Sequence, residues 1–196
     1  SVFKWQRYDI NDAGRYLRIV SADGIIALRE VGVQADGEWL AIEPDETNAA
    51  LLDEQDTIPE RPGYENSTYF DEIYHARTAY EHLNGIVPYE NTHPPLGKVF
   101  IMIGVWIFGM VPFGWRIVGT LFGVAMIPAI YAFARAIFRK TWVAFAAALL
   151  LAVDFMHFTQ TRIATIDVYG VFFIIMMFYF MYRYTQTNYL CQGLKQ

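Results

Sequence analysis

The chain has 196 residues, of which 55% are apolar, 17% aromatic and only 18% charged, and its net charge is −5. This composition excludes a disordered chain and a purely soluble enzyme, because it is too apolar and too poor in charge for either. Residues 1–95 carry 7 Lys/Arg and 18 Asp/Glu (net −11), whereas residues 96–196 carry 8 Lys/Arg and 2 Asp/Glu (net +6). The acidic half would repel nucleic-acid phosphates, so no nucleic-acid partner is expected.

Residues 1–60 are predicted to be β-rich. Short apolar or alternating runs at 16–20, 25–31 and 39–42 are separated by Asp-Gly pairs, which are strong turn signals. Three or four short strands bury little core, so we expect half of a small sandwich whose partner strands precede Ser1. The absence of an initiator Met and of a signal peptide also predicts a piece of a longer protein.

Residues 61–95 are predicted to form a loop with one amphipathic helix. The helix is expected over 68–84, with Ser67 or Thr68 as its cap and Gly85 after its end. A Pro-rich stretch at 87–95 then forbids regular helix.

Four apolar stretches follow this loop. The first, 96–111, is short for a span, and an interfacial or re-entrant helix over 96–112 is expected. The other three, 115–138, 142–158 and 168–184, predict three transmembrane helices within 113–186, followed by a tail over 187–196.

The orientation follows from the basic residues. Arg135, Arg139 and Lys140 surround one tight connection, which is therefore predicted to be cytoplasmic. The acidic half and the connection at 160–167 then lie outside the cell membrane, and the tail lies inside. Cys191, the only cysteine, is in that tail, so neither an intrachain disulfide nor a Cys-based zinc site is expected.

Asp71 is the first residue to consider for chemistry. On the predicted helix Asp71, His75, Thr78 and His82 share one face, and Asp71 lies in the first turn, where the positive helix end stabilises a carboxylate. An ionised, positioned carboxylate can take a proton from an attacking hydroxyl group. The competing interpretation is that this acid only caps the helix.

Other ionisable residues gather on the same predicted face of the membrane, where charges are costly and often functional. Arg116 could bind a phosphate bidentately, or it could lie at the interface beside Trp115 as an ordinary amphipathic side chain. Arg162 and Asp167 could belong to a site or form a structural pair.

Histidines offer weaker hypotheses. His93 could be a ligand or could make a hydrogen bond within its loop. His75 and His82 have a spacing that permits metal binding, but no cysteine and few acids accompany them, so no metal is expected.

The order of four motifs carries more information than any one of them. These are Tyr-Phe-Asp-Glu-Ile-Tyr at 69–74, Glu-Asn-Thr-His-Pro-Pro-Leu-Gly-Lys at 90–98, Trp-Arg at 115–116 and Thr-Gln-Thr-Arg-Ile-Ala-Thr-Ile-Asp at 159–167. In this order they closely resemble the bacterial form of the protein O-mannosyltransferase family, glycosyltransferase family 39. The match covers about residues 64–184.

The resemblance implies a polytopic α-helical membrane protein with a partial type-C glycosyltransferase fold and an N-terminal extracytoplasmic β-rich segment, similar to part of a galactose-binding-like sandwich. It implies a polyprenyl-phosphate sugar as donor, a protein or glycan as acceptor, membrane lipid around the helices, and no cofactor. Transfer to Ser/Thr hydroxyls would take place on the outer face of the cell membrane, with inversion.

The resemblance also implies roles for individual residues. Asp71 resembles the general base and Glu72 supports it. Arg116 resembles the phosphate-binding arginine, helped by Lys98. The site is further supported by His93, Arg162 and Asp167.

Three alternatives remain open. The acceptor could be a lipid or a cell-wall glycan, to which related transferases of the same architecture attach sugars. The chain could instead be a membrane-anchored carbohydrate-binding module, although an anchor needs no Arg116, Arg162 or Asp167 on one face. A transporter would place ionisable groups near the bilayer midplane, whereas those here lie near helix ends.

The predicted orientation can be tested by cysteine labelling in sealed cells. A membrane-impermeant reagent should label a cysteine placed beside Asp167 and should not label one placed beside Arg139, because the bilayer separates the two connections. The reverse pattern of labelling would overturn the topology.

Overall fold

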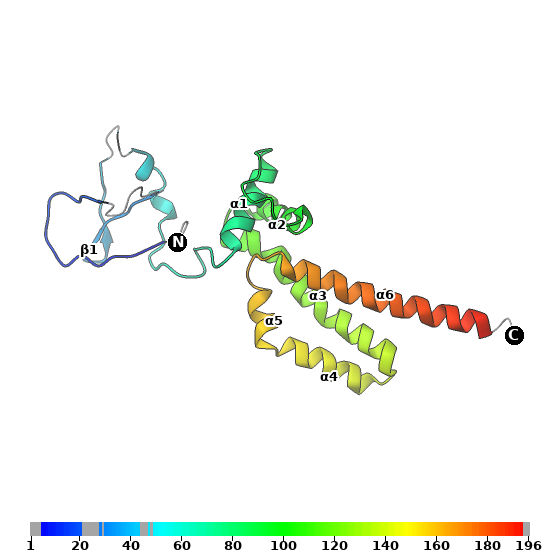
Figure 1. Cartoon of the computed structure of the whole chain (residues 1–196). Helices are drawn as coiled ribbons and strands as arrows, with labels where there is room; N and C mark the ends of the chain where they lie inside the picture. The colour runs from blue at the N-terminus through cyan, green and yellow to red at the C-terminus, as the bar shows by residue number, and fades with distance from the viewer. Residues whose placement is uncertain (1–4, 21–27, 29, 44–46, 48, 194–196) are drawn as a thin grey trace. The chain divides into compact units, whose positions relative to one another are not determined.

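The computed structural model describes residues 5–20, 28, 30–43, 47 and 49–193, with side chains as far as residue 187. The chain divides into two compact units, Trp5–Gly63 and a helical unit that begins at Tyr64 (Figure 1).

The N-terminal unit contains one β-hairpin among its described residues. Strands β1 (Gln34–Ala35) and β2 (Glu38–Trp39) pair antiparallel, and two short 3-10 helices follow, η1 (Ala49–Leu51) and η2 (Gln55–Thr57). Asp36 and Gly37 form the turn with φ of 51° and 87°, as expected where both central residues of a two-residue hairpin loop are left-handed. The turn predicted from this Asp-Gly pair is therefore confirmed.

The wider β-rich prediction for residues 1–60 is not confirmed. Residues 16–20 form no strand, and Tyr16 and Val20 are largely exposed, because no described strand pairs with this run to bury its apolar side chains. Residues 25–27 and 29 of the second predicted run lie outside the described residues.

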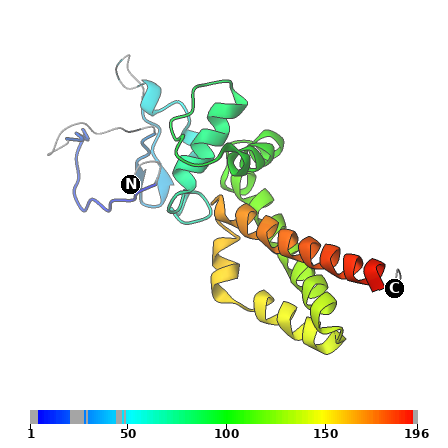
Figure 2. The ribbon, with the colours of Figure 1, turned by 45° about the vertical axis from the view of Figure 1, so that its right-hand side comes forward.

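Six α-helices are described in the second unit: α1 (Glu72–Leu83), α2 (Pro95–Phe108), α3 (Pro112–Phe138), α4 (Thr141–Ala152), α5 (Phe155–Gln160) and α6 (Asp167–Gly193). The long α3 is the centre of the unit and packs against α2, α4 and α6. Both views show α4 and α6 on either side of α3, with α5 leading back toward the start of α6 (Figures 1 and 2). Helix α1 packs on α2.

Among the described residues, two helices are long and apolar enough to cross a membrane, α3 and the part of α6 from Asp167 to Thr187. Helices α2 and α4 are apolar but have only 14 and 12 residues, fewer than the roughly 20 that a span needs. The prediction of one continuous helix over 142–158 is wrong. Asp154 interrupts it, because its side chain accepts a hydrogen bond from His157 N (2.6 Å) and so caps the separate helix α5.

Helix α1 begins later than predicted. Phe70 has a left-handed backbone (φ 55°), which no α-helix can contain, so the helix starts at Glu72 with Asp71 as its N-cap rather than near Thr68. Its end agrees with the prediction, since Asn84 is the C-cap and Gly85 follows with φ of 66°.

Close packing of α2 on α3 depends on glycine. A Cβ atom at Gly104 would lie 2.2 Å from the carbonyl oxygen of Gly114, so no larger residue fits without moving the backbone of α3.

Replacing Gly104 by Ala should therefore lower the free energy of unfolding by about 1–3 kcal/mol, the usual cost of overpacking. The matched control is Gly170→Ala in α6, where a Cβ atom meets no heavy atom within 4 Å and where alanine favours the helix. Thermal unfolding in detergent measures both variants. Equal midpoints for the two would contradict the close contact.

Candidate functional site

The carboxylate of Glu72 is the most enclosed acidic group in the helical unit, with 0% of the residue exposed. Its Oε1 accepts hydrogen bonds from Arg116 Nε (2.7 Å) and from the backbone N of Ala164 (2.8 Å). Its Oε2 accepts from Arg116 Nη2 (2.6 Å) and from the backbone N of Tyr69 (2.7 Å). Two acceptor positions on each oxygen are thus filled, so Glu72 has little capacity left to act as a base.

Arg116 lies in the first turns of α3. We call Glu72, Arg116 and the main-chain groups bonded to them the clamp. Besides Glu72, its guanidinium donates to the carbonyl oxygens of Tyr64 (2.6 Å, from Nη1) and Ser67 (2.9 Å, from Nη2). These bonds use four of the five N–H groups of an arginine. The guanidinium therefore fixes the 64–72 loop on α3, and its bonds to the described residues leave one N–H group of Nη1 for any phosphate.

Asp71 differs from its neighbour Glu72. It is the N-cap residue of α1, yet its side chain makes no capping hydrogen bond, and none of the described residues bonds to its half-buried carboxylate. Its backbone O accepts hydrogen bonds from Tyr74 N (3.0 Å) and His75 N (3.2 Å). The structure does not support side-chain capping as the reason for this acid.

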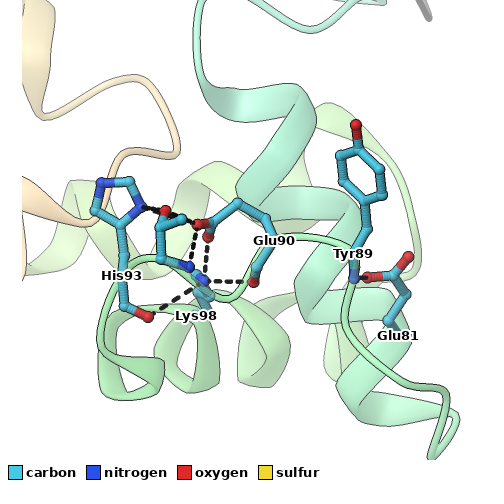
Figure 3. A network of polar contacts seen from close by, with 6 residues as sticks. Glu81, Tyr89, Glu90, His93 and Lys98 are labelled. Atoms are coloured by element: carbon cyan, nitrogen blue, oxygen red, sulfur yellow. Dashed lines mark hydrogen bonds and ion pairs between the residues drawn. The ribbon is translucent and has the colours of Figure 1, made fainter.

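A second polar cluster holds the Pro-rich loop (Figure 3). Lys98 of α2 is 1% exposed, and its Nζ donates to the backbone O of Glu90 (2.8 Å) and of His93 (3.4 Å) and forms an ion pair with the Glu90 carboxylate. These partners occupy its three N–H groups. Lys98 therefore anchors the loop, and the structure leaves it no free N–H group for a donor phosphate.

Glu90 gathers the same loop around its carboxylate. Its Oε1 accepts from Thr92 N (2.7 Å) and lies 3.1 Å from His93 Nδ1. Burial alone would raise the pKa of the Glu90 carboxyl, but the hydrogen bonds from Lys98, Thr92 and His93 outweigh it and hold that pKa well below its usual range. The predicted loop hydrogen bond of His93 is thus present.

His75 lies behind this loop, in the interior of the unit. It is 4% exposed, its Nδ1 is buried without a hydrogen-bond partner among the described residues, and its ring meets that of His93 edge to face, with centroids 5.7 Å apart. Burial and the nearby His93 lower the pKa of His75, opposed by Asp71 and Glu90. The described residues contain no group of three or more metal-ligating side chains.

Glu81 ties the other end of α1 to the loop, a role that sequence reasoning missed. Its carboxylate accepts from Tyr89 N (2.7 Å, Figure 3) and from Arg77 Nε (2.7 Å), and the Arg77 guanidinium lies 4.3 Å from the centre of the Tyr89 ring. The signal available in the sequence was an acid four residues after an arginine on the predicted helix.

Comparison with known proteins assigns these helices to a family. A family model described as dolichyl-phosphate-mannose-protein mannosyltransferase matches residues 92–194, more than half of the chain. The chain belongs to this mannosyltransferase family. The resemblance drawn from the four motifs is thereby confirmed.

The curated relatives carry one name, polyprenol-phosphate-mannose–protein mannosyltransferase. Those of Mycobacterium tuberculosis and Mycolicibacterium smegmatis are 37% and 36% identical over 115 residues, which is 56% of this chain and 22% of theirs. That of Corynebacterium glutamicum is 42% identical over 82 residues, 42% of this chain and 16% of its own. The chain thus spans about a fifth of the length of these relatives. No solved structure matches it.

In this mannosyltransferase-family chain, Arg162 and Asp167 do not form the structural pair that was one of the two interpretations. Both are exposed, no ion pair joins them within the described part of the chain, and the Arg162 guanidinium lies 4.8 Å from the centre of the Phe158 ring. The segment between them contributes to the clamp through the backbone N of Ala164 instead. Every residue except proline has a main-chain N–H group, so the residue type at 164 could not reveal this hydrogen bond.

Removing one side of the clamp should cost more stability than removing an exposed arginine. Arg116→Met leaves the Glu72 carboxylate buried without its cation, and we expect a loss of about 3–5 kcal/mol in the free energy of unfolding. The double variant Glu72→Gln/Arg116→Met should lose less than the sum of the two single variants, because no charge then stays buried alone.

The control is Arg162→Met, for which a loss of about 1 kcal/mol or less is expected. Denaturant unfolding of the purified chain gives all four values. A cost at Arg116 no larger than that at Arg162 would show that the clamp does not hold the fold.

Proposed function

We propose that this chain is the catalytic-loop region of a membrane mannosyltransferase that moves mannose from a polyprenyl-phosphate carrier to Ser/Thr hydroxyls of proteins. The observation that carries the proposal is the contrast between two adjacent acids. The carboxylate of Glu72 accepts four hydrogen bonds. Asp71, the residue before it, has a half-buried carboxylate to which no described group bonds. The names of the relatives supply the donor and the acceptor class.

The chemistry requires one base. Asp71 accepts the proton of the acceptor hydroxyl, the hydroxyl oxygen forms a bond to the anomeric carbon, and the bond from that carbon to the phosphate oxygen breaks. The carrier phosphate leaves with the electron pair, so no acid needs to protonate it. Direct displacement of this kind inverts the anomeric centre.

The negative charge on the departing phosphate must be stabilised by a nearby hydrogen-bond donor of the protein. Arg116 is the better candidate, since one N–H group of Nη1 remains beyond its described bonds and its side chain is 17% exposed. Lys98 is enclosed and fully bonded, so in this proposal it only holds the loop. Asp167 and Arg162, both exposed, would contact the acceptor or the carrier.

The proposed setting is the outer face of the cell membrane in a multi-pass protein. The basic connection between α3 and α4, with Arg135, Arg139 and Lys140, would be cytoplasmic. Asp71 and the Pro-rich loop would then face outward, where secreted and surface proteins pass.

Asp71→Asn should abolish transfer, with a loss of about 10²–10⁴-fold in turnover and little change in donor binding, because asparagine keeps the shape but cannot accept the proton. Membranes carrying the natural full-length gene product are given polyprenyl-phosphate-mannose and a Ser/Thr-rich peptide. Mass spectrometry then looks for a hexose on the peptide.

The control for this test is Glu65→Gln, which removes an exposed acid from the same loop and should leave turnover unchanged. Near-normal turnover by Asp71→Asn would end the assignment of Asp71 as the base. Donor consumption without a hexose on the peptide would redirect the proposal to a lipid or cell-wall glycan acceptor.

A further inference from the structure

His75 is a buried side chain that neither the clamp nor the loop cluster uses. Its backbone N donates to the backbone O of Asp71 (3.2 Å), so the two residues lie one helical turn apart on the same face of α1. A buried ring nitrogen without a hydrogen bond is costly, at about 1–3 kcal/mol, and needs an explanation. A nitrogen that must receive a proton during each reaction cycle supplies one.

His93 connects this buried ring to solvent. Its ring lies edge to face against His75, with centroids 5.7 Å apart, while 53% of its own side chain is exposed. Its Nδ1 lies 3.1 Å from Glu90 Oε1, which fixes the ring at the loop surface (Figure 3). Because the two rings are in contact, the path from His75 to bulk solvent runs through the exposed ring of His93.

Within the described part of the chain, four charged or titratable groups act on His75. Asp71 lies at the start of its own helix, His93 and Glu90 lie on the Pro-rich loop, and Lys98 lies on α2. Burial, His93 and Lys98 disfavour the charged imidazole, whereas the two carboxylates favour it. The net result is a pKa of His75 below its ordinary value of 6.5, so the ring is neutral at pH 7 and can accept a proton.

We propose that His75 is a proton relay that resets Asp71 after each transfer. The proposal rests on the assignment of Asp71 as the base. After the hydroxyl proton has moved to the Asp71 carboxylate, it passes to a ring nitrogen of His75, then to His93, and then to water. Asp71 regains its charge, and both histidines return to the neutral form before the next acceptor binds.

The test compares His75→Gln, His75→Ala and the control His82→Gln in the full-length protein in membranes. His82 lies on the same helix near its far end and is partly exposed. We expect His75→Gln to lower kcat on the order of tenfold with unchanged KM for donor and peptide, because binding does not involve the relay. His82→Gln should leave both parameters unchanged.

Chemical rescue separates a relay from a purely structural role. Added imidazole should restore turnover to His75→Ala, and a series of substituted imidazoles of equal size should do so in an order set by their pKa values. Rescue that is independent of the pKa of the added base, or no rescue at all by any of them, would overturn the relay. Thermal unfolding of each variant shows whether a loss of activity is a loss of fold.

The pH profile gives a second readout. When the pH falls below the lowered pKa of His75, the ring becomes protonated and can no longer accept a proton. We therefore expect kcat of the natural protein to decrease at acid pH, and we expect this pH dependence to be absent from His75→Gln. An inactive Asp71→Asn together with a fully active His75→Gln would reject the relay and leave the proposed function intact. An active Asp71→Asn would reject the proposed base itself.

Discussion

The helical unit depends on one buried charge pair. Glu72 cannot lie in the interior as a carboxylate unless its charge is matched, and Arg116 matches it with two hydrogen bonds. The same two side chains also bind main-chain groups at Tyr64, Ser67, Tyr69 and Ala164. Three segments far apart in the sequence are therefore held at one point, and the position of Asp71 follows from it.

Most of the charges in the conspicuous motifs serve structure rather than chemistry. Lys98 and Glu90 fix the Pro-rich loop on α2, and Glu81 fixes the preceding residues on α1. Lys98 and Glu81 are buried, Glu90 is partly buried, and each has its partners, as enclosed charges must. Several described polar groups near the clamp make no hydrogen bond: the Asp71 side chain, Nδ1 of His75, Nε1 of Trp115 and Oγ1 of Thr165. Of these, a carboxylate and an imidazole are the kinds of group that can act as a base.

The sequence predicted what depends on neighbouring residues and missed what depends on distant ones. The end of α1 at Asn84, the turn at Asp36–Gly37 and the apolar helices follow from local signals. The partners of Glu72 lie 44 and 92 residues away, so no local pattern could show that Arg116 is bound to an acid. The break at Asp154 was hidden for another reason, since one polar residue in an apolar run does not reveal whether it caps a new helix.

The two adjacent acids show how one helix start can divide structure from chemistry. Consecutive residues on a helix point about 100° apart, so when one side chain faces the packed interior the next faces away from it. Glu72 is directed to α3 and is longer by one methylene group, which lets its carboxylate reach the guanidinium and two main-chain N–H groups. The shorter Asp71 stays at the helix end, beside His75 and outside the clamp. If Asp71 is the base, as proposed, its neighbour supplies the rigidity that a reactive carboxylate needs, and no described group forms a capping bond with its oxygens.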